Sequence, residues 1–254
     1  MAVTREKGGG VLPAKEHKER FVRDMFNSIA GRYDLMNSLM SMGLDHSWRR
    51  FAVRRAELAP GGKGLDICCG TGKIVMEQAR VAGTSGSVTG LDFSEQMLAV
   101  AQENLRAFSL SETIRLIRGN AMKLPFEDNS FDCATVGWGL RNVPDIAGAL
   151  KEMVRVVKPG GKVVSLDMAQ PTAPVFKQMY WLCFEKIIPA MGNLWAGNKG
   201  AYAYLHDSAQ LFPPQWELAE MFAAAGLQET EFHNLAGGVV AVVEGRKPSE
   251  RTRS

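Results

Sequence analysis

A pair of glycines in the segment LDICCGTGK could bring the backbone close to a small ligand. Gly70 and Gly72 directly follow an apolar run that is typical of a buried strand, and a ligand at the carboxyl end of a sheet needs such a close approach. A dinucleotide fingerprint would need a third glycine where Val75 stands, and a P-loop would need serine or threonine where Ile74 stands. The loop therefore argues against a nicotinamide dinucleotide and a nucleoside triphosphate, and an ordinary turn is the alternative interpretation.

Two carboxylates accompany this loop. Asp66 lies inside the strand before the glycines, and Asp92 ends the next predicted strand. A carboxylate at the position of Asp92 can accept hydrogen bonds from both hydroxyls of a ribose, whereas Asp66 suits a ligand with positive charge. S-adenosylmethionine meets both requirements, because it has a ribose, a sulfonium, an ammonium and no phosphate.

A third polar segment, GNAMKLPF, follows the next predicted strand. The Asn120 side chain could bind the adenine or the ribose, and the backbone of Ala121 could meet the adenine edge. An asparagine turn, which is common after a strand, is the alternative. Because all three segments stand at the carboxyl ends of their own strands, they favour one cofactor site at the switch point of a sheet.

A parallel sheet is needed to bring these segments together. Short apolar runs begin at Gly64, Ser87, Thr113, Phe131 and Gly161. They alternate with helical stretches at Ile74 to Val81, Glu95 to Phe108 and Ile146 to Val157. This alternation predicts an α/β fold with a doubly wound parallel sheet.

The two ends of the chain add further elements. Apolar spacing predicts a helix from Lys15 and a second one from Ser47 to about Leu58, which together form an N-terminal helical cap. A helix from Pro214 to Ala225 precedes two apolar runs around Gly237, and these runs predict a C-terminal β-hairpin at the sheet edge. The whole sheet is then seven-stranded and mostly parallel.

The composition indicates a folded protein that does not bind nucleic acid. Hydrophobic residues make up 46% and charged residues 22% of the 254 residues, close to the globular average. The formal net charge of +3 is too small for a protein that binds duplex nucleic acid through its phosphates.

The four cysteines form no C-x-x-C pair and predict reduced thiols. Since the sequence contains neither a signal peptide nor a membrane-spanning run, we expect a cytoplasmic protein.

Three longer motifs make the sequence resemble a class I S-adenosylmethionine-dependent methyltransferase, and more closely the ubiquinone/menaquinone biosynthesis C-methyltransferase family. They are YDLMNSLMSMGLDHSW at 33–48, GWGLRNV at 137–143 and RVVKPGGK at 155–162. AYAYLHDSAQLFP from Ala201 and ELAEMFAAAGL from Glu217 agree as well, so the resemblance covers most of residues 20 to 246. Two positions depart from the family pattern: Asp45 stands where a histidine is usual, and Gly137 where some members have serine.

The resemblance implies a Rossmann-like methyltransferase domain over 16–247, with the helical cap at 16–60 and a lid for the acceptor at 174–212. We expect mobile tails at 1–15 and 248–254. Among the site residues, the resemblance implies Thr71, Asp92, Asn120 and Ala121 as contacts of S-adenosylmethionine; Thr71 is the one that the spacing did not indicate. It also implies that the acceptor is a ring carbon of a demethylated, prenylated quinol.

A menaquinone precursor is the favoured acceptor, because the Cys-Cys-Gly-Thr form of the glycine loop is similar to that of bacteria that make menaquinone alone. The analogous ubiquinone precursor, another small phenol or RNA are alternative acceptors. Outside this class, an NAD-dependent reductase and a noncatalytic adenosine-binding module are the alternatives.

An aromatic carbon becomes a good nucleophile when a neighbouring hydroxyl ionises, so the site needs a base or a cation that stabilises the quinolate. We assign this role to Arg141 with Asn142, because arginine stays protonated and can lower the pKa of the hydroxyl. A structural Arg141–Asp145 pair is the alternative. Tyr33, Tyr202 and Tyr204 are candidate acceptor contacts, with Asn37 and His206 as further members of the pocket or a proton relay. No metal is required.

A prenyl tail needs an apolar environment, so we also expect contact with a membrane surface, at the inner face for a cytoplasmic enzyme. The segment WRRFAVRRAEL, residues 48–58, combines four arginines with Trp48, Phe51 and Leu58, as an interfacial helix does. An ordinary solvated basic face is the alternative interpretation.

Overall fold

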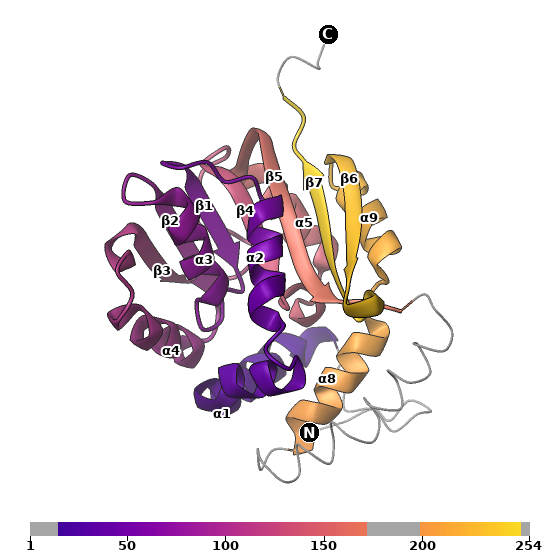
Figure 1. The fold of residues 1–254 in the computed structure, drawn as a ribbon. Helices are drawn as coiled ribbons and strands as arrows, with labels where there is room; N and C mark the ends of the chain where they lie inside the picture. Colours follow the sequence, from indigo (N-terminus) through magenta and orange to yellow (C-terminus); the bar gives the residue numbers. More distant parts are fainter. Residues whose placement is uncertain (1–14, 172–198, 250–254) are drawn as a thin grey trace.

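The computed structural model describes residues 15–171 and 199–249, which form a seven-stranded sheet with helices on both faces (Figure 1). The strands are β1 (Lys63–Ile67), β2 (Ser87–Asp92), β3 (Ile114–Arg118), β4 (Phe131–Gly137), β5 (Val157–Met168), β6 (Gln228–Leu235) and β7 (Val240–Arg246). The α-helices are α1 (Lys15–Met40), α2 (Asp45–Arg55), α3 (Lys73–Ala82), α4 (Glu95–Arg106), α5 (Ile146–Val156), α8 (Lys199–Leu211) and α9 (Gln215–Ala224). Three short 3-10 turns are η1 (Ser111–Thr113), η2 (Leu140–Asn142) and η4 (Ala236–Gly238).

The strand order is β3-β2-β1-β4-β5-β7-β6, and β7 runs antiparallel to both of its neighbours, β5 and β6. This confirms the predicted fold class, including the C-terminal hairpin. The hairpin enters the sheet through its second strand: β7 lies between β5 and β6, and β6 forms the edge. The reason is burial, because β7 is apolar and buried along most of its length while β6 alternates with exposed residues. The chain reverses its winding between β1 and β4, which places a switch point at their carboxyl ends.

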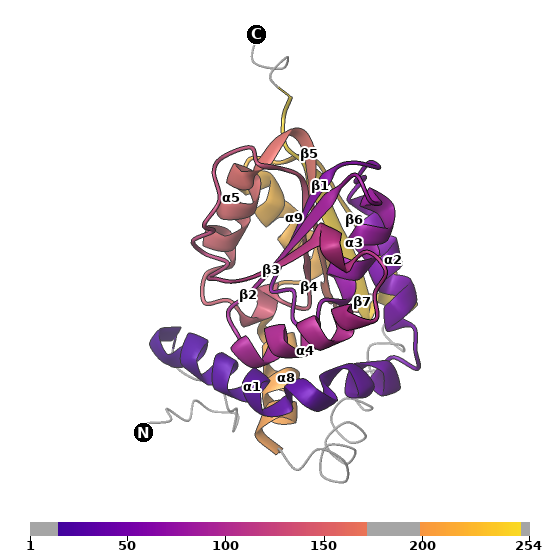
Figure 2. The same ribbon diagram turned by 90° about the vertical axis from the view of Figure 1, so that its left-hand side faces the viewer.

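Two apolar cores hold the helices against the sheet. Leu150 of α5 and Phe222 of α9 are fully buried on one face, and Ala52 of α2 packs with Val75 and Ala79 of α3 on the other. Figure 2 looks along the sheet from the β3 edge and shows these two helical layers on opposite sides. Neither of these two cores covers the carboxyl ends of the strands. The helices α1 and α8 lie at those ends, below the sheet in Figure 1.

The boundaries of two predicted elements shift. The second helix begins at Asp45 rather than Ser47 and ends at Arg55 rather than near Leu58, because the Asp45 carboxylate lies in its first turn, where acidic groups are favoured. β5 begins at Val157 rather than Gly161, because Val157 already pairs with Phe131 of β4.

The interpretation of residues 48–58 as an interfacial helix is wrong. Trp48 and Phe51 pack against the core beneath α2, and Leu58 is buried. Arg49 is buried beside Asp45, and Arg55 binds Glu244 of β7. The segment therefore turns its apolar side chains toward the sheet. Separately, no helix within residues 15–171 and 199–249 combines the length and the apolar character that crossing a membrane would require.

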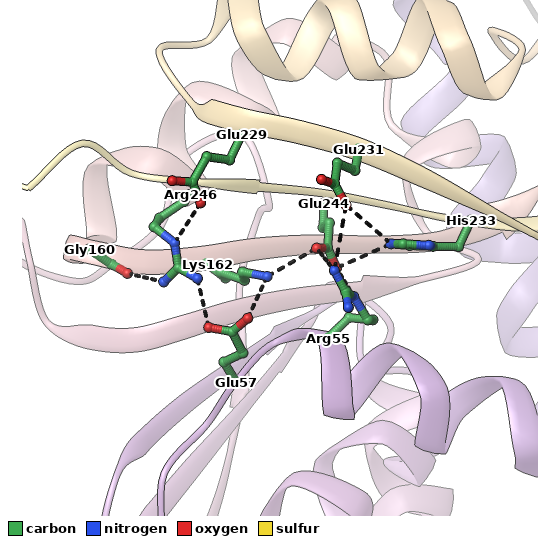
Figure 3. A network of polar contacts seen from close by, with 9 residues as sticks. All are labelled: Arg55, Glu57, Gly160, Lys162, Glu229, Glu231, His233, Glu244 and Arg246. Carbon is green, nitrogen blue, oxygen red and sulfur yellow. Dashed lines mark hydrogen bonds and ion pairs between the residues drawn. The ribbon is translucent and has the colours of Figure 1, made fainter.

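An ion-pair network fastens α2 and the chain after it to β5 and the hairpin (Figure 3). The Glu244 carboxylate, 2% exposed, accepts hydrogen bonds from Arg55 Nε at 2.6 Å and from Lys162 Nζ at 3.0 Å. Lys162 also pairs with Glu57 at 2.7 Å, and Glu57 in turn pairs with Arg246 at 2.7 Å. Burial alone would raise the pKa of Glu244, but its bonds to Arg55 and Lys162 outweigh burial and hold that pKa below the ordinary value.

Replacing Glu244 with alanine should destabilise the protein by about 3–5 kcal/mol, because it leaves the buried Lys162 ammonium and the Arg55 guanidinium without this partner. Denaturant unfolding at pH 7 measures the loss. Glu229→Ala is the matched control: Glu229 is 69% exposed, and its pairing with Arg246 should contribute less than about 1 kcal/mol.

The same substitution has a pH signature. The pKa of Glu244 is lower in the folded than in the unfolded protein, so its contribution is complete above the unfolded value of about 4.3 and is lost as the pH falls through the folded pKa. The stability gap between wild type and Glu244→Ala should shrink on that acid side. A gap that stays constant to pH 3 would contradict this account of the network.

Candidate functional site

The predicted glycine loop forms a tight connection between β1 and α3. Gly70 and Gly72 adopt positive φ angles of 54° and 80°, which suit glycine. A Cβ atom on Gly72 would lie 3.3 Å from the Cβ of Ala101 in α4, so the loop also packs closely against that helix. The Gly70 N–H donates a hydrogen bond of 2.8 Å to Asp92, which joins the loop to the end of β2.

Two non-glycine residues beside this loop have strained backbones. Cys68 has a φ of 52° and Trp138, after β4, a φ of 53°. Both residues border the two cavities described below. Strain of this kind persists where the surrounding structure enforces it, and it concentrates at ligand sites.

The larger cavity, of about 680 Å³, lies at the carboxyl ends of β1, β2 and β4. Six residues predicted for the site line it: Tyr33, Gly70, Asp92, Asn120, Ala121 and Asn142. The α1 helix contributes Glu19 and Phe26 as well as Tyr33 to the same wall. The structure thus brings Gly70, Asp92, Asn120 and Ala121 to one cavity, as expected for residues at the ends of parallel strands.

The Asp92 carboxylate is 5% exposed and partly occupied by backbone donors. Its Oδ1 accepts from the Ser94 N–H at 2.9 Å and its Oδ2 from Gly70. Burial raises the pKa of Asp92, although these backbone bonds oppose the rise. A carboxylate offers about four acceptor positions, so capacity remains for a ligand hydroxyl on each oxygen.

Asn120 forms the asparagine turn that the sequence analysis gives as the alternative to a ligand contact. Its Oδ1 accepts a hydrogen bond of 2.8 Å from the Met122 N–H. The residue lines the larger cavity all the same, so the turn positions it at the wall. Ala121 is buried beside it.

A smaller cavity of about 320 Å³ adjoins the first and shares Tyr33, Cys68 and Gly70 with it. Asp66, Thr71, Arg49 and Lys73 line its wall. Asp66 is 1% exposed; burial raises its pKa to about 8, against the hydrogen bond of 2.5 Å that it accepts from Thr135. A cavity with one carboxyl and two cationic side chains suits the ammonium and carboxylate of an amino acid. Gly72, predicted with this set, borders neither cavity and acts through the packing of its loop.

Thr71 connects the glycine loop to α1. Its hydroxyl donates a hydrogen bond of 2.6 Å to Asp34, which also pairs with Lys73 at 3.2 Å. At other points along α1, Ser94 donates to Asn27 at 2.6 Å, and Lys18 donates to the carbonyl of Arg141 at 2.9 Å. Polar contacts thus hold α1 across the carboxyl edge of the sheet.

The two departures from the family pattern have structural reasons. Asp45 is 2% exposed, binds the guanidinium of Arg49 and accepts a bond of 3.0 Å from Ser41. It thereby holds Arg49 at the smaller cavity, with its guanidinium 5.0 Å from the centre of the Trp138 ring. At Gly137 a Cβ atom would overlap the Ile74 side chain, so a serine would not fit beside Ile74 as it lies.

Arg141 is 7% exposed and belongs to the turn η2 after β4. Its Nη1 atom donates hydrogen bonds to Asp167 at 2.6 Å and to the Trp138 carbonyl at 2.9 Å. The alternative pairing with Asp145 is wrong, because the Asp145 carboxylate caps α5 by accepting from the Gly148 N–H. The neighbouring Asn142 also donates to the Trp138 carbonyl, at 2.9 Å.

Asp167, which the sequence analysis did not single out, is the ion-pair partner of the predicted site residue Arg141 and lines neither of the two cavities. It lies near the end of β5, is 2% exposed, and its Oδ1 accepts from Arg141 and from the Met168 N–H. Burial raises the pKa of Asp167, while the Arg141 charge opposes the rise. A signal was present, since the predicted strand GKVVSLDM carries an aspartate near its end, as the strand that ends at Asp92 does.

The three predicted tyrosines have different positions. Tyr33 borders both cavities; burial raises its pKa, against the charge of Arg141 and a hydrogen bond with Asn37. Tyr204 of α8 is 2% exposed, and burial raises its pKa to about 12. Tyr202 lies in the same helix, but its side chain is outside the described part.

Of the predicted lid at 174–212, residues 174–198 lie outside the described part of the chain, as do nearly all residues of both predicted tails. His206 contacts Asp207 and Gln210 and has 23% of its side chain exposed.

The described cysteines are free thiols, as predicted. Burial raises the pKa of Cys68 and Cys69 well above the ordinary value, and that of Cys133 to about 12. Because the thiolate is the reactive form, these residues act as packing groups beside the cavities.

Comparison with known proteins places these features in a family. The model of the ubiE/COQ5 methyltransferase family matches residues 14–247. A demethylmenaquinone methyltransferase of Desulfitobacterium hafniense (strain Y51) is 61% identical over 231 residues, which cover 91% of each chain. A protein of the same name from Bacillus cytotoxicus is 47% identical over 92% of this chain and 98% of its own.

Solved structures with low sequence identity share the fold. The [4+2]-cyclase SpnF superimposes with a TM-score of 0.68 at 19% identity, covering 91% of this chain and 97% of its own. An S-adenosylmethionine-dependent methyltransferase from Thermotoga maritima, described as a possible histamine N-methyltransferase, gives a TM-score of 0.62 at 21% identity. That match covers 89% of this chain and 99% of the other.

Proposed function

This chain belongs to the ubiE/COQ5 methyltransferase family, and on that premise we propose that it transfers the methyl group of S-adenosylmethionine to a ring carbon of demethylmenaquinol. It is an S-adenosylmethionine-dependent C-methyltransferase of menaquinone biosynthesis. The observation that supports the site assignment best is the meeting of Gly70, Asp92, Asn120 and Ala121 at one cavity on the switch point of the sheet.

The two adjoining cavities fit the two halves of S-adenosylmethionine. We assign the adenosine to the larger one, with Asp92 on the ribose and with Asn120 and Ala121 at the adenine. We assign the amino-acid end to the smaller one, where Asp66 meets the ammonium and Arg49 with Lys73 meets the carboxylate. When bound, the cofactor supplies an electrophilic methyl group. Thr71 and Gly72 keep the loop between these contacts in place.

This assignment predicts that cofactor affinity rises with pH. The pKa of Asp66 is about 8 in the free protein, so at pH 6 the side chain is mostly neutral, and binding an ammonium must displace its proton. Between pH 6 and about 7.5 the Kd for S-adenosylmethionine should fall by roughly tenfold or more, because the ionised share of Asp66 rises steeply below its pKa while the cofactor's own α-amino group keeps its proton below about 7.7. Calorimetric titration measures the trend, and Asp66→Asn should bind weakly with a flat profile. A flat profile in the wild type would remove Asp66 from the ammonium site.

The acceptor side of the proposal rests on Arg141 and Asn142. A cation beside the quinol ring lowers the pKa of a ring hydroxyl and stabilises the charge that makes the ortho carbon nucleophilic. Arg141 is the buried cation of η2, and Asn142 borders the larger cavity next to it. Tyr33, Tyr202 and Tyr204 are assigned to the acceptor pocket, and Tyr33 also touches the cofactor side because it borders both cavities.

The acceptor carries a prenyl tail, which places the reaction at a membrane surface. For a cytoplasmic enzyme this surface is the inner face of the membrane. One feature favours α1 rather than α2 as the contact. The end of α1 and the turn after it expose Leu35, Leu39, Met42 and Leu44, and Met42 is 85% exposed. This apolar group belongs to the helix that crosses the carboxyl edge of the sheet.

One experiment tests the reaction and the location together. Reduced demethylmenaquinol is incorporated into liposomes and supplied with methyl-labelled S-adenosylmethionine and the protein. We expect the label in the lipid fraction and the protein in the liposome pellet. Label found in a demethylated ubiquinol precursor, but not in demethylmenaquinol, would replace the proposed acceptor; methyl transfer without sedimentation would remove the membrane contact.

The reductase alternative is tested in parallel by NADH binding. The third glycine of a dinucleotide site is replaced by Val75, which is fully buried in the contact between α3 and the sheet. We therefore expect no thermal stabilisation by NADH and clear stabilisation by S-adenosylmethionine.

A further inference from the structure

Four buried polar atoms around η2 have no hydrogen-bond partner within the described residues. They are Arg141 Nε, Asn142 Oδ1, Asp167 Oδ2 and Tyr204 Oη. A buried polar atom without a partner is unfavourable, so this group of four indicates a place for a polar ligand, and Asn142 of the group lines the larger cavity. The set contains donors and acceptors, which matches a ring that carries hydroxyl groups.

Electrostatics connect these residues across four elements. The charges of Arg141 and Asp167 both act on Tyr33 of α1 and on Tyr204 of α8: burial raises both tyrosine pKa values, the Arg141 charge lowers them, and the Asp167 charge raises them further. Cys68 after β1 also senses Asp167. Within the described residues, Arg141, Tyr33, Tyr204 and Cys68 are thus titratable or charged groups that interact electrostatically with the Asp167 carboxylate.

Among these groups Asp167 is the one suited to take a proton. Arg141 stays protonated. Burial raises the pKa values of both tyrosines, so they are neutral at pH 7. The Asp167 carboxylate directs Oδ1 to Arg141 at 2.6 Å and to the Met168 N–H at 2.8 Å, and these two bonds leave Oδ2 unengaged.

We propose that the Oδ2 atom of Asp167 binds a ring hydroxyl of the quinol and accepts its proton, an inference that rests on the function proposed above. The ring carbon then forms its bond to the methyl group as the carbon–sulfur bond of the cofactor breaks. The proton on that carbon leaves to solvent, and Asp167 returns its own proton to the ring oxygen. One proton is released per methyl group, and no oxidant or reductant is consumed.

A binding experiment isolates the hydroxyl contact from turnover. The probes are 4-methoxy-1-naphthol and 1,4-dimethoxynaphthalene, which share a ring system and differ in one hydroxyl; both are titrated with S-adenosylhomocysteine saturating. The wild type should prefer the naphthol by about tenfold or more, since a hydrogen bond to a charged group is worth about 1.5–3 kcal/mol. In Asp167→Asn the preference should fall below about threefold, because an amide NH₂ replaces the accepting oxygen.

Single-turnover methyl transfer to reduced demethylmenaquinol tests the proton step. Asp167→Asn should be slower by at least about 100-fold, the usual contribution of a positioned base. Its rate should keep rising about tenfold per pH unit as the acceptor ionises in solution, whereas the wild-type rate levels off once Asp167 is ionised. Asp167→Glu keeps the charge beside Arg141 but moves the carboxylate, so we expect an intermediate rate that still levels off.

Ser165→Ala is the matched control. Ser165 lies two residues earlier on the same face of β5, is 1% exposed, and its hydroxyl also has no partner within the described residues. Neither the probe preference nor the rate should change. Cofactor affinity and melting temperature report whether Asp167→Asn is folded. If Asp167→Asn is not folded, the rate of Asp167→Glu tests the role of Asp167 instead.

The outcomes separate this inference from the proposed function. If the wild type methylates no quinol, the proposed function fails. If the wild type methylates the quinol and a folded Asp167 variant does so at the same rate, or if the wild type does not prefer the naphthol, the assignment of Asp167 is overturned and the function stands.

Discussion

Replacing Arg141 with alanine should lower the single-turnover rate of methyl transfer by at least about 100-fold while cofactor affinity stays within about twofold. The rate falls because the ring carries developing negative charge mainly in the transition state, where a buried cation is most effective. Affinity is retained because Arg141 borders neither of the two cavities assigned to S-adenosylmethionine. The measurement uses labelled methyl groups, saturating reduced demethylmenaquinol and a rapid quench.

The ion pair between Arg141 and Asp167 gives Arg141→Ala a second effect on the rate of methyl transfer. Arg141 Nη1 binds Asp167 at 2.6 Å, and the Arg141 charge opposes the effect of burial on the pKa of that carboxyl. Without the guanidinium, the pKa of Asp167 rises further, so a smaller share of the carboxyl is ionised at any given pH. The variant would then lack the cation and part of the ionised carboxylate, so its rate should recover with rising pH.

Two comparisons decide between this mechanism and a structural role. Arg141→Lys keeps the charge but not the planar fork that reaches Asp167 and the Trp138 carbonyl together, so it should restore part of the rate. The oxidised quinone should be inert with every variant, because it has no hydroxyl to ionise. A wild-type rate in Arg141→Ala, or equal methylation of quinone and quinol, would contradict the assignment.

The part of the site that could be predicted from sequence consists of short-range signals. An apolar run followed by glycines or an acid marks the end of a parallel strand, and parallel strands bring their ends to one edge. Gly70, Asp92 and Asn120 were placed in this way, and they line one cavity. The same alternation of strands and helices predicts the parallel sheet, whereas its strand order comes from the structure.

The part that could not be predicted depends on pairing between distant segments. Arg49 and Arg55 have the charge pattern of a solvated or interfacial helix, but each pairs with a carboxylate: Arg49 with Asp45, four residues earlier in the same helix, and Arg55 with Glu244 of β7. No periodicity in residues 48–58 reveals Glu244, which lies on β7. The alternative interpretation of Arg141 paired it with Asp145, four residues away, whereas its partner in the structure is Asp167 of β5.

The second large effect is expected at the ribose. Asp92→Ala should weaken S-adenosylmethionine binding by at least about tenfold, because two charge-assisted hydrogen bonds to the ribose are lost. The protein should remain folded. However, Asp92 also accepts the N–H bonds of Gly70 and Ser94, so its loss loosens the glycine loop and costs about 1–3 kcal/mol of stability. Weaker binding alone would therefore not distinguish a ribose contact from a distorted loop.

A thermodynamic cycle separates these two causes. S-adenosylhomocysteine and its 2′,3′-dideoxy analogue are titrated into the wild type and into Asp92→Ala, so that the ligand and the protein each lose one side of the contact. If Asp92 binds the ribose, removing the hydroxyls should cost the wild type about tenfold and the variant almost nothing. If Asp92 acts through the loop alone, the hydroxyls should matter equally in both proteins, and the two penalties should add. That additive result would assign Asp92 to loop support and leave the ribose to another side chain of the larger cavity.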